Sequence, residues 1–342
     1  MAIFILGYRF KGAKTNNLID TMGLKEHMHF KDVAKIYILT WQFILIRFLL
    51  MLVFIGIAIV YFSSVFGIVL SQIGVENLIS TLLSIGSIST ATYLYWHIYK
   101  LFSKYVLYLV KGAHIAVVTN YIQTGKVSQK SQLIYGFKTM KDKFLSVSVL
   151  FVVHALLETV LKEAHTRLMK LGDWAKLPKA LTYVISGTIN TAIAFIDEAV
   201  LAYMFTRKNE DALKSAKDGL VLYVKNWLWI LLTAAILSII VYGTMAAAGI
   251  FIYFEGIPFS SLNLILQSMY SVLTVGIVII LYSGLVQPLL EIAIIVTYLK
   301  EIKGQSPDIG TVEWLKENSK GFRNLASTKV MEKLIGGAKS LS

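Results

Sequence analysis

The chain contains no cysteine among its 342 residues, and only 15% of the residues are charged. The absence of cysteine excludes disulfides, thiolate metal ligands and a cysteine nucleophile. A soluble domain of this length would carry about 25% charged residues. The chain also lacks a phosphate-binding P-loop, a nucleophile elbow and a zinc-binding histidine pair on a helix. We therefore predict a membrane protein that is not an enzyme and that holds no metal or cofactor.

Hydrophobic residues make up 56% of the sequence, and they gather in long runs. Six runs approach the roughly 20 residues that a helix needs to cross a bilayer. They are 36–62, 73–96, 144–161, 180–206, 226–254 and 262–290. This pattern predicts an all-α fold, a polytopic integral membrane helical bundle with about six transmembrane helices and additional interfacial amphipathic helices. We divide the chain into a basic N-terminal segment (1–35), a transmembrane domain (36–303) and a basic C-terminal tail (304–342).

Lysine and arginine outnumber aspartate and glutamate by 33 to 20, and they crowd the segments between the apolar runs. Basic loops favour the cytoplasmic side and attract anionic lipid headgroups. We therefore expect both termini to be cytoplasmic and the short loop 255–260, which has no lysine or arginine, to be external. Only five of the 33 basic residues are arginine, and no arginine-rich motif is present. Direct nucleic-acid binding is not expected.

Two segments conflict with this topology. Residues 97–120 are apolar but carry three lysines and His114, which fits an interfacial or re-entrant helix, or else a seventh span. Residues 162–179 carry five basic residues but would lie outside. Either this loop violates the positive-inside rule, or residues 144–206 form a hairpin that does not cross fully. We take the first alternative as the working prediction.

The adjacent acids Asp197 and Glu198 are the main functional lead, because they are the only charges in the apolar run 180–206. On a spanning helix Asp197 would lie about 15 Å below Arg207, near the middle of the membrane. A carboxylate there costs about 2.5–3.5 kcal/mol on insertion scales. The two side chains point about 100° apart, so they cannot both face one partner. They predict either a cation- or proton-binding site or a structural ion pair.

Other ionisable or aromatic residues of the spans extend this hypothesis. His154 and Glu158 share a helix face, which is compatible with a proton relay or with ordinary structural hydrogen bonds. Tyr203 follows the acid pair, and aromatic rings beside a carboxylate can hold a quaternary ammonium group. Arg47 and Glu291 are candidates for a structural ion pair, Arg47 also as the partner of Asp197 or Glu198.

The segment between Arg207 and Trp227 has the pattern of a surface helix. Asn209 is the expected N-cap, and the apolar residues Leu213, Ala216 and Leu220 recur at helical spacing. We expect this helix to lie in the plane of the lipid headgroups. A similar mixed pattern over 311–335 predicts a helix that docks on a neighbour or on lipid.

Two stretches resemble the choline transporter-like family. Phe195-Ile-Asp-Glu-Ala-Val-Leu-Ala-Tyr is similar to that family's Phe-x-Asn-x-x-Ala-Tyr segment, and Ser215-Ala-Lys-Asp-Gly-Leu-Val-Leu-Tyr-Val-Lys-Asn resembles its Ser-Ala-Lys/Arg-Asp-Ala-Phe-x-Leu-x-x-x-Asn motif. Leu157-Glu158 falls near a matching Leu-Glu. The resemblance covers roughly 100–300 and implies a helical transporter for choline or a related cation. This chain has Asp197 where the family has asparagine, and it is shorter, with fewer spans.

Together these patterns predict a multi-pass transporter for a small cationic, choline-like solute, with Asp197, Glu198, His154 and Glu158 handling charge. The competing class is a non-catalytic membrane subunit of a secretion, translocation or DNA-transfer complex, docked through its small-residue helix faces and basic segments. The expected partners are the bilayer with its anionic headgroups, the solute, and a second copy of the chain or other subunits of a membrane complex.

Overall fold

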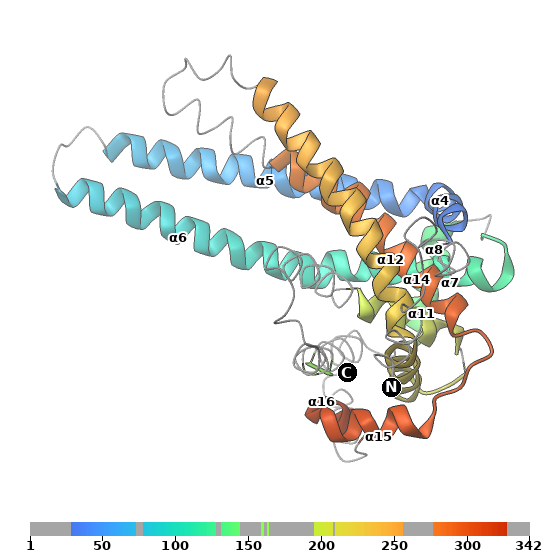
Figure 1. Ribbon diagram of the computed structural model, residues 1–342. Coiled ribbons are helices and arrows are strands. Elements are labelled where there is room, and N and C mark those ends of the chain that lie inside the picture. Colours follow the sequence, from blue (N-terminus) through green and yellow to red (C-terminus); the bar gives the residue numbers. More distant parts are fainter. Residues whose placement is uncertain are drawn as a thin grey trace, which may run out of the picture. The chain divides into compact units, whose positions relative to one another are not determined.

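The computed structural model describes residues 29–72, 78–127, 131–143, 159–160, 163, 195–207, 209–255 and 276–326. In these ranges the protein is all-helical and contains no strand, which confirms the predicted class (Figure 1). The helices are α4 (Phe30–Leu39), α5 (Trp41–Gln72), α6 (Leu78–Phe102), α7 (Tyr108–Thr124), α8 (Gln132–Lys143), α11 (Ile196–Thr206), α12 (Ala212–Glu255), α14 (Gln287–Glu301), α15 (Ile309–Asn318) and α16 (Lys320–Ala326). Two π-helical segments are η2 (Ser103–Leu107) and η5 (Tyr282–Val286).

Three of the described helical stretches are long and apolar enough to cross a membrane: Trp41–Val65, Gly86–Thr124 and Gly276–Glu301. They support the membrane class predicted from composition. Most of the predicted spans 144–161 and 180–206, and the first half of 262–290, fall outside the described residues. The C-terminal half of α12, which covers the predicted span 226–254, is a continuous helix that ends at Glu255.

The chain divides into two compact units. The first unit comprises Met1–Ile36, Leu150–Ser238 and Glu291–Ser342, and the second comprises Tyr37–Val149 and Ile239–Leu290. Each unit is described separately below. The acid pair belongs to the first unit, whereas Arg47 belongs to the second.

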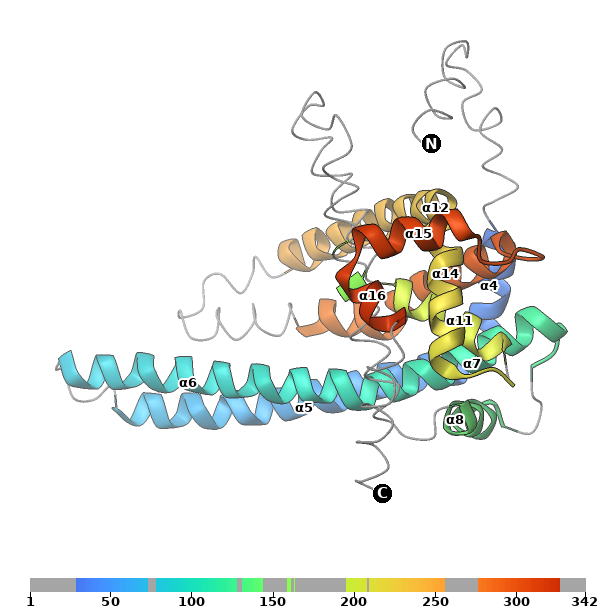
Figure 2. The same cartoon turned by 90° about the horizontal axis from the view of Figure 1, so that it is seen from below.

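The second unit contains a long antiparallel hairpin of α5 and α6, which lie side by side in both ribbon views (Figures 1 and 2). Aromatic side chains join the two helices. Phe54 stacks on Phe102 with ring centroids 4.8 Å apart, and the Tyr95 hydroxyl donates to the Phe54 carbonyl at 3.3 Å. The outward faces of α5 and α6 carry exposed large apolar side chains such as Val53 and Trp96. A bilayer or another apolar partner would cover such faces.

Residues 97–120 do not form a separate helix. The helix α6 continues through η2 into α7 without a break, and α7 ends where Gly125 adopts a φ of 69°. Nine residues of α7 are buried. Gly136 of α8 approaches so closely that a Cβ there would lie 2.5 Å from the Ala113 carbonyl oxygen. The lysines that made this segment unusual in the sequence therefore belong to one long helix whose second part packs inside the second unit.

In the first unit, the predicted surface helix is instead the beginning of α12, a continuous helix of 44 residues. Its N-cap is Asp211 rather than Asn209. The Asp211 carboxylate accepts hydrogen bonds from the backbone N–H groups of Leu213 and Lys214, at 2.9 and 3.0 Å. The predicted apolar stripe is confirmed: Leu213, Ala216 and Leu220 are all buried. The stripe packs inside the protein, so the prediction that this helix lies in the headgroup plane is wrong.

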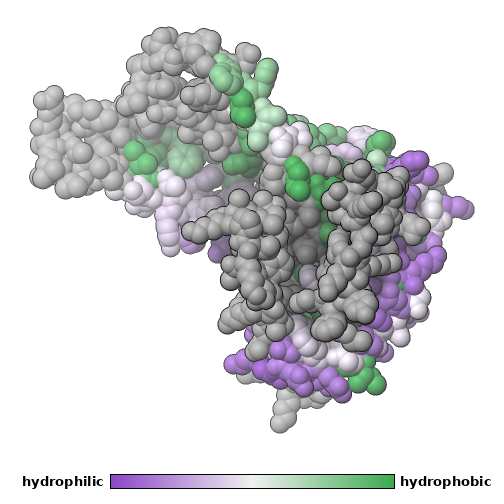
Figure 3. Space-filling model, in the orientation of Figure 1, coloured by the Kyte–Doolittle hydropathy of each residue, from purple (hydrophilic) through white to green (hydrophobic). Residues whose placement is uncertain are grey.

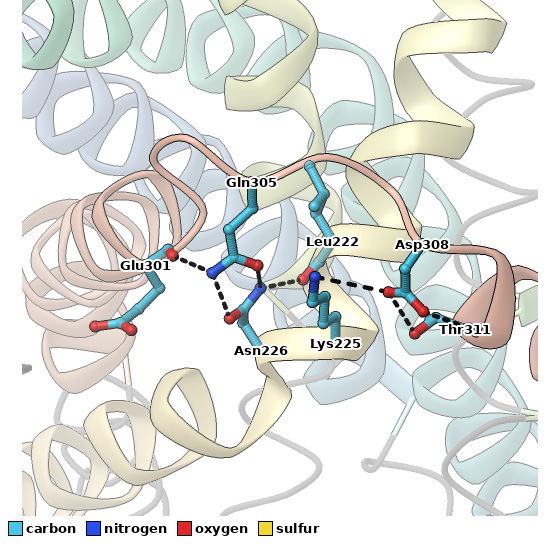
Figure 4. Close-up of polar contacts among 7 residues, drawn as sticks. All are labelled: Leu222, Lys225, Asn226, Glu301, Gln305, Asp308 and Thr311. Carbon is cyan, nitrogen blue, oxygen red and sulfur yellow. Dashed lines mark hydrogen bonds and ion pairs between the residues drawn. The ribbon is translucent and has the colours of Figure 1, made fainter.

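The segment after α14 is fixed to α12 by polar side chains (Figure 4). Asn226 and Gln305 exchange two amide hydrogen bonds, each of 3.1 Å. The Lys225 Nζ lies 3.8 Å from Asp308 Oδ2. Asp308 also caps α15, because its carboxylate accepts a hydrogen bond of 2.9 Å from the Thr311 N–H. Hydrophilic side chains cover α15 and α16 in the space-filling view (Figure 3). Leu315 and Phe322 on these two helices are buried.

Candidate functional site

The acid pair lies in the first turn of a short helix, and not midway along a spanning one. The helix α11 begins at Ile196, after Phe195, whose φ of −113° and ψ of 9° are not helical. Its first backbone hydrogen bond joins the Ala199 N–H to the Phe195 carbonyl at 3.3 Å. The prediction of an uninterrupted helix through Asp197 is therefore wrong.

This position changes the electrostatics of the acids. The N-terminal end of a helix carries a partial positive charge, which stabilises a nearby carboxylate by about 0.3–1 kcal/mol, and by up to about 2 kcal/mol when it is partly buried. Asp197 and Glu198 both occupy that end of α11. The helix therefore offsets part of the cost of burying two negative charges, which a mid-helix position would not do.

Both acids are enclosed by protein. Asp197 retains 7% of its surface and Glu198 none, and Glu291 on α14 of the same unit retains 1%. Every residue from Ile196 to Phe205 is buried, on all sides of the helix. Burying a charge is costly unless it is compensated by hydrogen bonds, an opposite charge or a bound cation. The first unit thus encloses three carboxylates, those of Asp197, Glu198 and Glu291.

Tyr203 is held on α11 by its neighbours. Its ring lies against the backbone of α12 at Gly219, where a Cβ would be only 2.9 Å from the Tyr203 Cδ1. The guanidinium of Arg207 lies over the ring, 5.3 Å from its centroid, and its Nε donates to the Tyr203 hydroxyl at 3.2 Å. One face of the predicted solute-binding ring is therefore covered by a cation of the protein itself.

Sequence reasoning missed Tyr298, which completes this packing. The Tyr298 hydroxyl donates to the Gly219 carbonyl at 2.7 Å, and its ring centroid lies 5.7 Å from that of Tyr223. Burial raises the pKa of the Tyr223 hydroxyl, so this hydroxyl stays protonated and neutral. Tyr298 is seven residues after Glu291, which places both residues on one face of α14. That spacing was the available signal.

The other predicted site residues are placed less completely. His154 and Glu158 lie outside the described residues, so the proposed relay stays a prediction. Arg47 is buried in the second unit, with 4% of its surface exposed. Its pairing with Glu291 or with the acid pair would join two units that are described separately, and it also stays a prediction.

A buried histidine of the second unit was not predicted as a functional residue. His114 on α7 is 1% exposed. Its Nε2 lies 2.9 Å from the Thr40 Oγ1, and its ring stacks on Phe43 with centroids 5.1 Å apart. Thr40 is the single non-helical residue between α4 and α5. The contact therefore fixes the bend between these helices against α7, which is a structural role.

Within the described ranges, no group of three or more histidine, aspartate or glutamate side chains could hold a metal ion. Comparison with known proteins adds no identity: no family model, no curated protein and no solved structure matches this chain. The likeness to the choline transporter-like family therefore stays a prediction, and the site can be interpreted only from its own residues.

Proposed function

We propose that this protein is a multi-pass membrane transporter that binds a small cation at Asp197 and Glu198. The observation that carries the proposal is the enclosure of both carboxylates at the start of α11, together with Glu291 in the same unit. A protein keeps acids in such a place when they have a partner or a task. The three apolar helices that could cross a membrane are consistent with this class.

The chemistry of the site favours a small cation over a large solute. Two adjacent carboxylates on one helical turn supply negative charge, while the residues that follow them are packed tightly against α12. We assign Tyr203 a packing role, since Arg207 already lies over its ring. Asp197 and Glu198 would bind the cation, and Glu291 would contribute to the local negative potential. Choline is the first solute to test, because the sequence resembles a choline transporter-like family.

The test is solute uptake by purified protein in proteoliposomes, with radiolabelled choline as the first probe and sodium and proton gradients varied. We expect Asp197→Asn and Glu198→Gln each to abolish uptake while leaving the helical content unchanged. Asp142→Asn on α8 is the matched control, because it removes the same charge from an exposed position. Normal transport by the Asp197 and Glu198 variants would refute their role.

One observation favours the competing class, a subunit of a larger membrane complex. On the C-terminal half of α12, nothing lies within 4 Å of the Cβ positions of Gly243 and Gly249. Gly243 and the exposed Ala247 are four residues apart, the spacing at which small residues allow close helix contact in membranes. Extraction in a mild detergent would separate the two proposals: a stable complex of defined stoichiometry, combined with absence of uptake, would favour the subunit.

A further inference from the structure

Two segments that the predicted topology places on opposite sides of the membrane touch each other. The Ser319 hydroxyl, between α15 and α16, donates to Glu163 Oε2 at 2.6 Å. The Gly321 backbone N–H donates to the same oxygen at 3.1 Å. Burial acts to raise the pKa of Glu163, but these hydrogen bonds outweigh it and lower that pKa. The contact is therefore one between an ionised carboxylate and the start of α16.

The packing around this contact is equally close. A Cβ on Gly321 would lie 3.1 Å from side-chain atoms of Thr159 and Val160, and both Val160 and Phe322 are completely buried. Thr159, Val160 and Glu163 are thus part of the same folded body as the beginning of the C-terminal tail. A topology in which 144–161 crosses outward would separate them by the roughly 30 Å of the hydrocarbon layer.

The helix α11 gives a second, independent argument. It has 11 residues, so it is about 16 Å long and covers only about half of the hydrocarbon layer. None of the exposed large apolar residues belongs to it. By contrast, the apolar parts of α5, α6 and α12 expose many such side chains, among them Leu49, Val60, Tyr93, Leu94, Ile250 and Phe251. Lipid-facing helices expose large apolar side chains, whereas core helices bury theirs.

Charge gives a third argument. Residues 162–179 contain five basic residues and two acidic residues. On the outside they violate the positive-inside rule, whereas on the side of the basic tail they obey it. Lys225 and Asn226 of α12 contact Asp308 and Gln305, so this part of α12 lies on the side of the tail.

We propose that Thr159, Val160, Glu163 and α11 lie on the side of the C-terminal tail, so that neither 144–161 nor 180–206 crosses the membrane and four of the six predicted crossings are left. These are the predicted spans 36–62, 73–96, 226–254 and 262–290. This topology keeps both termini on one side, as predicted, and removes the two central crossings. Asp197 and Glu198 then belong to a helical body on the tail side. If the proposed cation binding is correct, the cation reaches these acids from that side.

The test uses the absence of cysteine, because each introduced cysteine is then the only thiol in the chain. Lys170→Cys reports on the disputed loop, Lys303→Cys on the tail side and Ser261→Cys on the opposite side. Each variant is treated with a membrane-impermeant maleimide in right-side-out and in inside-out vesicles. We expect Lys170→Cys to react in the same vesicle orientation as Lys303→Cys. Reaction in the orientation that labels Ser261→Cys would overturn the proposal.

A cross-linking test covers the case in which position 170 is shielded from the reagent. The double variant Glu163→Cys/Ser319→Cys should be joined by a short bifunctional maleimide, because the native side chains are in contact, 2.6 Å between Glu163 Oε2 and Ser319 Oγ, and the linker spans the gap left by the shorter cysteine side chain. Glu163→Cys/Glu313→Cys is the control, because Glu313 is exposed and lies six residues earlier. Failure of the first pair to cross-link while both thiols react with reagent would overturn the proposal. Neither result depends on uptake, so the topology and the cation site can fail separately.

Discussion

The contact between Gly219 and Tyr203 leads to a prediction in which two opposing effects can be weighed. Replacing glycine with alanine within a helix normally stabilises it by about 1 kcal/mol. At Gly219 the new methyl group would lie 2.9 Å from Tyr203 Cδ1 and 3.3 Å from its Cβ. Carbon atoms prefer separations of about 3.5–4.0 Å, so the helices α11 and α12 must move apart.

Overpacking of this kind costs about 1–3 kcal/mol. The ring has little freedom to move, since Arg207 lies over it and its Cβ is tied to the α11 backbone. The Gly219 carbonyl also accepts the Tyr298 hydrogen bond, whose net contribution of about 1 kcal/mol weakens if the backbone shifts. We therefore expect Gly219→Ala to lower the free energy of unfolding by about 1–2 kcal/mol.

The measurement is denaturant-induced unfolding of the purified protein in detergent, followed by circular dichroism. Gly243→Ala on the same helix is the matched control, because no atom lies within 4 Å of the new methyl group. It should leave the free energy of unfolding unchanged or raise it by up to about 1 kcal/mol. In a Tyr203→Ala background the penalty of Gly219→Ala should disappear. Equal effects of the two glycine variants would refute the argument from close contact.

Two further predictions concern polar contacts of the first unit. Asp308→Ala should destabilise the protein by about 1 kcal/mol, because it removes the N-cap of α15. Asp308→Asn should cost less, since it keeps an acceptor for the Thr311 N–H. Thermal unfolding of both variants would rank them, and equal losses of stability would contradict a capping role. The hydrogen bond from Lys300 lowers the pKa of Asp32 below its ordinary value of 3.8. The folded form therefore gains stability above that value and loses it as the pH falls through the lowered pKa. Asp32→Asn should make unfolding less sensitive to acid between pH 5 and pH 2 (about the range in which an aspartate titrates), and an unchanged pH profile would contradict this.

The sequence was sufficient to predict the helical class and the buried stripe of α12, for a physical reason. Helical periodicity places Leu213, Ala216 and Leu220 on one face regardless of what covers that face. Periodicity does not show whether lipid or protein covers that face. The stripe was therefore expected to contact lipid, whereas it packs inside the protein. The predicted end of this helix near Trp227 was wrong, because α12 continues to Glu255.

At the candidate site, too, local sequence patterns predict less than the contacts between distant residues decide. The sequence predicted that Asp197 and Glu198 lie among apolar residues, but not that the protein itself encloses both acids. That α11 starts at Ile196 did not follow, since neither proline nor an N-capping side chain marks Phe195. The hydrogen bond between Glu163 and Ser319 joins residues 156 positions apart, and no local pattern predicts such a contact.

The length of an apolar run cannot by itself separate a spanning helix from a buried one, because both need the same composition. What separates them is the environment of the outward-facing side chains. In α5 these side chains remain exposed, as expected for a lipid-facing helix, whereas in α11 the protein encloses all of them. The carboxylates are tolerated in α11 because a helix end and surrounding protein replace water there, which the middle of a bilayer could not provide. The enclosure that led us to propose cation binding is therefore also the reason to place these acids outside a membrane-crossing segment.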